Sequence, residues 1–230
     1  MRIAGLQKMT LLDFPGKVAC TVFTAGCDFR CPFCHNYELT DRNVESVMTE
    51  EEFLRFLGRR KGLIDGVAVT GGEPCMQQDL PEFLAKIRDL GFLVKLDTNG
   101  NHPEVLERIL DEGLADYVAM DVKNSPDRYA ETSGLLHMDL SRIGQSIRLL
   151  MRGETDHEFR TTVVEELHGE EEIRAVCEWI SGARRYYLQP FTDRDTVPYD
   201  GFHAPSRDAM KRYLDIASGY VMQAEIRGMD

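Results

Sequence analysis

Three cysteines lie close together near the start of the chain, and their spacing is the strongest chemical signal in the sequence. Cys27, Cys31 and Cys34 are separated by three and then two residues. Cysteines in pairs two residues apart are typical of tetrahedral zinc sites. The spacing here, with no fourth cysteine nearby, suits three corners of a [4Fe-4S] cluster and leaves one iron without a protein ligand. A zinc site completed by His35 or by a distant cysteine, and an ordinary electron-transfer cluster, both remain open from these residues alone.

A glycine-rich segment that ends in a carboxylate follows a second apolar run. Gly71, Gly72 and Glu73 come directly after the run 67–70. Glycine lets a backbone approach a ligand closely, and a glutamate carboxylate accepts hydrogen bonds from an ammonium group. A turn that simply ends a strand is the other interpretation of this segment when it is taken by itself.

Charged residues also stand at or inside the later apolar runs. Asp97 ends the run 93–98, and Asp121 and Lys123 close the next run, which taken separately is typical of polar loops after buried strands. Arg160 lies within the otherwise apolar run 159–164. A buried arginine needs an anionic partner, unless its side chain reaches water at the strand end.

Apolar runs and amphipathic segments alternate along the chain, and these elements must position the motifs. The expected strands are 18–23, 67–70, 93–98, 117–121, 159–164 and 186–189, and the expected helices are 49–60, 80–90, 104–111, 141–151, 170–180 and 207–217. This alternation predicts parallel strands with right-handed helical crossovers, in an open doubly wound sheet or a barrel of six units. We expect one domain over residues 1–230, with the tail 220–227 adding a last, antiparallel edge strand.

The cysteine spacing and the glycine-rich segment together resemble the radical S-adenosylmethionine (SAM) superfamily. In that family the CxxxCxxC signature follows the first strand of a partial (β/α)6 TIM-like barrel of the α/β class, with an aromatic residue, here Phe33, before the third cysteine. Residues 71–73 are similar to its GGE motif, which binds the SAM amino group. The resemblance implies that the three cysteines hold a [4Fe-4S] cluster whose open iron binds SAM, and that an electron from the cluster cleaves SAM to a 5'-deoxyadenosyl radical.

The motifs after the third and fourth strands resemble those of enzymes that activate glycyl radical enzymes. In that group the DTNG and DxK motifs lie beside SAM, which implies that Asp97 and Asp121 help to hold a monovalent cation. Two carboxylates around one cation are physically sensible, because without it they would repel each other. The resemblance also implies that Lys123 reaches the SAM carboxylate or ribose, and Arg160 could pair with the same carboxylate or with Glu73.

The opening segments 5–8 and 13–17 look like those of the small activating proteins of anaerobic ribonucleoside-triphosphate reductase, and more loosely like those of pyruvate formate-lyase activators. This resemblance implies a glycyl radical enzyme as protein partner and an external flavodoxin or ferredoxin as electron donor. Thr192 departs from the pyruvate formate-lyase activators, in which a histidine lies near SAM at the comparable position. A small-molecule enzyme such as a carboxy-deazaguanine synthase, and a non-catalytic iron–sulfur electron carrier, are the alternatives.

The composition narrows the classes of partner and the compartment. The 39 acidic and 27 basic residues give a net charge of −12, which would repel nucleic acid and anionic membrane surfaces. No run approaches the length of a membrane span and no signal peptide is recognisable, so we expect a cytoplasmic protein without disulfides. Cys20 and Cys177 are expected in the core, and Cys75 near the cofactor. The histidines other than His35 are expected at loop surfaces.

Overall fold

One eight-stranded sheet carries the chain, and its strands follow one another in sequence order. The computed structural model describes residues 1–229. The strands are β1 (Ile3–Thr10), β2 (Ala19–Thr24), β3 (Gly66–Gly71), β4 (Leu93–Thr98), β5 (Tyr117–Asp121), β6 (Asp156–Val163), β7 (Tyr186–Pro190) and β8 (Ala224–Ile226). Strand β1 pairs with β2 in the antiparallel sense, and every later neighbouring pair is parallel.

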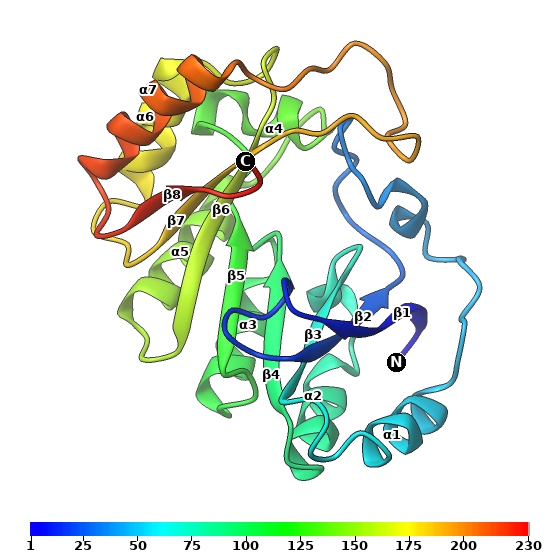
Figure 1. Ribbon diagram of the computed structural model, residues 1–230. Coiled ribbons are helices and arrows are strands. Elements are labelled where there is room, and N and C mark those ends of the chain that lie inside the picture. Colours follow the sequence, from blue (N-terminus) through cyan, green and yellow to red (C-terminus); the bar gives the residue numbers. More distant parts are fainter. Residues whose placement is uncertain (230) are drawn as a thin grey trace.

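The connections between the parallel strands are mostly helical. The helices are α1 (Glu50–Gly58), α2 (Leu80–Asp89), α3 (Pro103–Asp111), α4 (Tyr129–Thr132), α5 (Leu140–Arg152), α6 (Glu170–Trp179) and α7 (Arg207–Ser218), with short 3-10 turns η1 (Tyr37–Thr40), η2 (Pro74–Met76) and η3 (Pro126–Arg128). Helix α1 contacts α2, α2 contacts α3, α3 contacts α5, and α6 contacts α7. The helices therefore form a layer along the sheet (Figure 1), and they bury the apolar runs that predicted the strands.

The sequence predicted the six strands β2–β7 and the six longer helices, and the structure confirms this α/β fold. Strand β1 was not predicted, because its central residues are partly or fully exposed and lack a continuous apolar run. The prediction of an antiparallel last strand was wrong, since β8 is parallel to β7. Helix α7 crosses back between these two strands, and a crossover of this kind returns the chain in the same direction.

The candidate site residues lie together at the carboxyl ends of the parallel strands. Because β2–β7 are parallel, their carboxyl ends meet at the same side, where barrel active sites lie. Strand β2 leads into the segment 25–36, which contains the three clustered cysteines and is called the cysteine loop below. Strand β7 leads into the segment 191–206, called the closing segment below. In Figure 1 this orange segment reaches across to the blue segment that follows β2.

Candidate functional site

A cavity of about 500 Å³ opens at the carboxyl ends of the strands. Its wall includes side chains or backbone from every strand between β2 and β7. All the residues for which the sequence predicted a ligand or cofactor role line it, namely Cys27, Cys31, Phe33, Cys34, Gly71, Gly72, Glu73, Asp97, Asp121, Lys123 and Arg160. Residues up to 133 positions apart in the sequence thus meet at one site, because the parallel strands end there.

The cysteine loop holds its three thiols free and largely buried. Cys27, Cys31 and Cys34 form no disulfide, and the Cys34 amide donates to the Cys31 carbonyl at 3.2 Å. Burial raises the pKa of all three thiols, that of Cys31 to about 11, while the nearby Lys123 ammonium works in the opposite direction at Cys31 and Cys34. Three neutral thiols packed around one cavity become thiolates only beside strong positive charge. Three free thiols lining one cavity are a donor set that would fit an iron–sulfur cluster, whose iron would supply that charge.

The two glycines of the GGE segment are required by a close approach of two backbones. A Cβ atom on Gly71 would lie 2.2 Å from the Thr24 nitrogen, and one on Gly72 would lie 2.1 Å from the Gly26 carbonyl oxygen. The Gly72 amide donates to the Thr24 carbonyl at 3.0 Å, and the next amide donates to the Gly26 carbonyl at 2.8 Å. The sequence predicted close approach to a ligand. The structure shows that these glycines join the end of β3 to the start of the cysteine loop.

Glu73 lies behind these glycines with no exposed surface, and its carboxylate has three protein donors. One oxygen accepts from the Cys75 amide at 2.9 Å and from the Thr98 hydroxyl at 2.8 Å, and the other accepts from the Asn99 amide at 2.6 Å. Burial raises the pKa of Glu73, although these hydrogen bonds oppose the rise. Glu73 therefore ties the end of β4 to the end of β3. Cys75 is buried beside it and is not among the residues that line the cavity.

Arg160 joins the two aspartates of the site. Its Nε atom lies 2.9 Å from Asp121 and its Nη1 atom 3.5 Å from Asp97. Asp121 also pairs with Lys123 at 3.0 Å, and Asp97 pairs with Lys95. Burial opposes ionisation of both aspartates, but the Arg160 guanidinium, with the lysines, lowers the pKa of each. Both carboxylates therefore have protein partners, and a monovalent cation between them stays a prediction.

Three basic groups thus accompany two carboxylates at this side of the cavity. Lys95 was missed in the sequence, although a lysine inside the buried run 93–98 is the same kind of signal that singled out Arg160. Together, the two aspartates and the three basic side chains carry one more positive than negative charge. An anionic group on a bound molecule would balance it.

Aromatic contacts join the cysteine loop to the closing segment. The Phe33 ring packs edge-on against Phe191 and Phe202, with centroids 6.4 and 6.5 Å away. The His35 ring stacks on Phe191 at 5.5 Å, and its Nε2 atom lies 2.6 Å from the Thr192 carbonyl oxygen. The position at which Thr192 replaces a histidine therefore contacts the cysteine loop through its backbone. These contacts close one side of the cavity.

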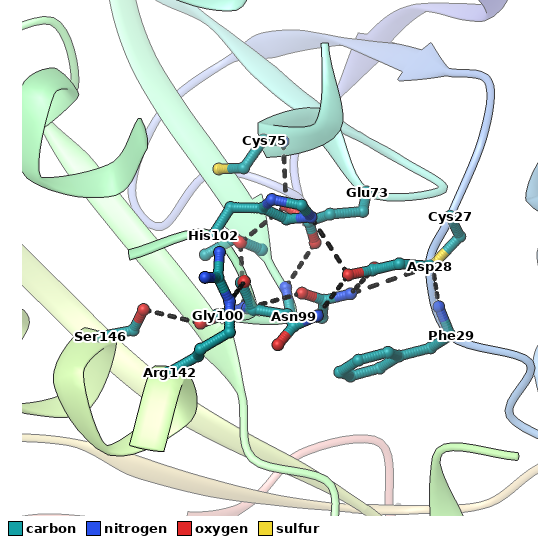
Figure 2. A network of polar contacts seen from close by, with 12 residues as sticks. Cys27, Asp28, Phe29, Glu73, Cys75, Asn99, Gly100, His102, Arg142 and Ser146 are labelled. Carbon is teal, nitrogen blue, oxygen red and sulfur yellow. Dashed lines mark hydrogen bonds and ion pairs between the residues drawn. The ribbon is translucent and has the colours of Figure 1, made fainter. Parts of the chain in front are cut away.

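A polar network that the sequence did not reveal lies between the cysteine loop and the loop after β4 (Figure 2). One oxygen of Asp28 accepts from the Asn99 side chain at 2.8 Å, and the other accepts from the Asn101 side chain at 2.5 Å and lies 3.1 Å from His102 Nε2. Burial works against ionisation, yet hydrogen bonds from His102, Asn101 and Asn99 lower the pKa of Asp28 to about 2. His102 therefore helps to hold Asp28 in the site and does not lie free at a loop surface. The surface prediction was also wrong for His157, which lies in β6, and for His168, because each is only 2 % exposed.

Comparison with known proteins supports the same family. The model of the radical SAM superfamily matches residues 21–148. A protein of Methanocaldococcus jannaschii that carries the provisional name glycyl-radical enzyme activating enzyme is 30% identical over 233 residues, which is 98% of this chain and 95% of that protein. The pyruvate formate-lyase-activating enzyme of Clostridium pasteurianum is 34% identical over 138 residues, which is 55% of this chain and 54% of that enzyme.

Solved structures share the fold at low sequence identity. SuiB of Streptococcus suis bound to S-adenosylmethionine superposes with a TM-score of 0.69 at 14% identity, covering 89% of this chain and 49% of that chain. A domain of the pyruvate-formate lyase-activating enzyme of Bacteroides vulgatus gives 0.58 at 18% identity, covering 71% and 99%. In residues 1–229 no helix is long and apolar enough to cross a membrane. With the cysteine loop and the charged cavity at the carboxyl ends of its strands, the chain belongs to the radical SAM superfamily of enzymes, whose cofactors are a [4Fe-4S] cluster and S-adenosylmethionine.

Proposed function

We propose that this enzyme activates a glycyl radical enzyme by removing a hydrogen atom from a backbone glycine of that partner. The observation that carries the proposal is the single cavity in which three free cysteines meet the GGE segment and the cluster of aspartates and basic groups. The similarity to the M. jannaschii activating enzyme over nearly the whole of both chains supports the choice of reaction.

In this proposal Cys27, Cys31 and Cys34 hold the cluster, and Phe33 packs beside it against the closing segment. When bound, the reduced cluster would supply the electron that cleaves S-adenosylmethionine to methionine and a 5'-deoxyadenosyl radical. The cysteine loop positions the thiolates through its hydrogen bonds to the end of β3.

The remaining site residues would bind S-adenosylmethionine by charge. Glu73 lines the cavity, and its carboxylate could accept a hydrogen bond from the ammonium group of the ligand. Lys123 and Arg160 are paired to Asp121 and Asp97, and with Lys95 these five side chains carry one more positive than negative charge, which suits the ligand carboxylate. Gly71 and Gly72 hold Glu73 in place against the cysteine loop.

The partner must bring a glycine to this cavity. Among residues 1–229 no strand pairs β1 with β8, so the sheet stays open beside the cavity, as entry of a peptide loop requires. The resemblance of the first residues favours anaerobic ribonucleoside-triphosphate reductase as the partner. A flavodoxin or ferredoxin donor and a cytoplasmic location belong to the same proposal.

The test begins with anaerobic reconstitution of the full chain with iron and sulfide. We expect about four iron atoms per chain, and release of 5'-deoxyadenosine when S-adenosylmethionine and a low-potential reductant are added. Cys31→Ala should abolish both, whereas Cys177→Ala, which removes a buried thiol of helix α6, should keep both. A glycyl radical doublet in the electron paramagnetic resonance (EPR) spectrum of a co-incubated partner would support the proposed reaction. An intact cluster that never cleaves S-adenosylmethionine would refute it and would favour an electron carrier.

A second candidate is a small-molecule reaction. The 7-carboxy-7-deazaguanine synthase of Clostridium acetobutylicum is 29% identical over 123 residues, which is 51% of this chain and 54% of that enzyme. If a purine-like compound and no protein stimulates cleavage of S-adenosylmethionine, this second function replaces the first.

A further inference from the structure

The Asn99 side chain lies where three parts of the site meet, and its role goes beyond the ligands named so far. Its backbone amide donates to Glu73 at 2.6 Å, its side-chain nitrogen donates to Asp28 at 2.8 Å, and the same nitrogen lies 3.9 Å from the Cys27 sulfur. Asn99 is only 7 % exposed. Figure 2 shows its side chain between Asp28 and Glu73, close to Cys27.

The neighbours of Asn99 determine which end of its side-chain amide faces the sulfur. The amide oxygen accepts from the Asn101 backbone N–H at 2.9 Å, so the nitrogen must point the other way. There it meets Asp28, whose carboxylate accepts hydrogen bonds and donates none. Both contacts agree on one orientation, in which an N–H group faces Cys27.

Cys27 has a second donor and a nearby negative charge. The Phe29 backbone amide lies 3.4 Å from its sulfur, so backbone and side-chain donors converge on this cysteine. Asp28 is the neighbour of Cys27 in the chain, and its carboxylate is held by hydrogen bonds from Asn99, Asn101 and His102. The first cysteine of the cluster motif therefore has both a donor and an anion beside it.

These two groups act on a cluster in opposite directions. A hydrogen bond to a ligating sulfur stabilises the more negative, reduced cluster and raises its reduction potential, whereas a neighbouring carboxylate destabilises that state. We propose that Asn99 and Asp28 are positioning residues that set the reduction potential of the cluster, Asn99 as the amide donor at Cys27 and Asp28 as the anion that orients this amide. The inference rests on the proposed function, because it requires Cys27 to ligate the cluster.

The test is an anaerobic redox titration of the reconstituted full chain, followed by the EPR signal of the reduced cluster. Asn99→Ala removes the donor but keeps the backbone bond to Glu73, and should shift the midpoint potential downward. Asp28→Asn removes the charge but keeps the shape, and should shift it upward. We expect each variant to change the ratio of reduced to oxidised cluster at a fixed potential by about tenfold, or about 59 mV for one electron.

The control is Ser146→Ala, which removes a 2.7 Å hydrogen bond to the Gly100 carbonyl in the same loop and should leave the potential unchanged. If Asn99→Ala does not fold, Asn99→Ser must give the same downward shift, because its hydroxyl is too short to reach Cys27. Unchanged potentials at wild-type iron content, shifts of the same sign, or loss of the cluster from both variants would overturn the inference. A wild-type chain that binds no cluster would instead overturn the proposed function.

Discussion

Arg160→Met is the sharpest test of the charged cavity wall, because it removes the group that joins two buried carboxylates. Arg160 lies 2.9 Å from Asp121 and 3.5 Å from Asp97, and its side chain is 13% exposed. Removing one partner of a buried ion pair costs about 3–5 kcal/mol. Because each aspartate keeps one lysine, we expect the lower limit, about 3 kcal/mol of unfolding free energy at pH 7.

The assay is urea unfolding of the apo-protein, with Arg152→Met as the matched control. Arg152 pairs with Glu107 on the surface and is 69% exposed, so its loss should cost less than about 1 kcal/mol. A difference between the two variants smaller than about 1 kcal/mol would contradict the electrostatic account of the site, since an exposed pair would then be worth as much as the buried cluster.

The difference in unfolding free energy between wild type and Arg160→Met should depend on pH with a definite sign. The pKa values of Asp97 and Asp121 are lowered in the folded protein, so their contribution is complete above the unfolded value of about 3.9 and is lost as the pH falls through the lowered values. In Arg160→Met these pKa values rise. As the pH falls, the aspartates of the variant are therefore protonated before those of the wild type, which removes their destabilising buried charge. The stability gap should therefore narrow as the pH is lowered from 7 towards 4. A gap that widens in acid would refute the assignment.

Further expectations concern the segment that joins β3 to the cysteine loop. Gly72→Ala places a Cβ atom 2.1 Å from the Gly26 carbonyl oxygen, so it should cost at least about 2 kcal/mol of unfolding free energy and reduce the iron bound. The control Gly58→Ala, whose Cβ atom meets nothing within 4 Å, should do neither. Urea unfolding and iron analysis measure the two effects. Glu73→Gln forces an amide to face backbone donors and should cost about 1–3 kcal/mol in the apo-protein. Equal unfolding of Glu73→Gln and wild type would mean that the hydrogen bonds of this carboxylate do not hold the site together.

The sequence predicted the central fold well because parallel strands covered by helices must be apolar on both faces. It failed at the two edges of the sheet for a physical reason. Strand β1 has exposed central residues and no continuous apolar run, whereas a last strand was predicted within 220–227 and only its direction was wrong. The direction of β8 depends on how α7 packs against β7, which is a tertiary contact.

For the candidate site, the sequence predicted which residues take part but not how they contact one another. Cysteine spacing, the GGE segment and charges at strand ends could be found, since each is local in the sequence and the topology alone brings strand ends together. The contacts among these groups depend on loop packing and could not be found. Arg160 meets two aspartates from two other strands, and Asn99 meets Asp28 from a loop 71 positions earlier.

In residues 1–229 the sheet has two outer edge strands, β1, which is bridged only at Ile3 by Met48, and β8. An edge strand presents free backbone donors and acceptors, and a second copy of the chain could add to it as readily as a substrate loop could enter. The exposed Lys8 on β1 and Glu225 on β8 place charges on these edges, and β8 has only three residues. Charge and shortness both disfavour strand addition by another copy. The opening can thus remain available to a partner while the concentrated enzyme stays dispersed.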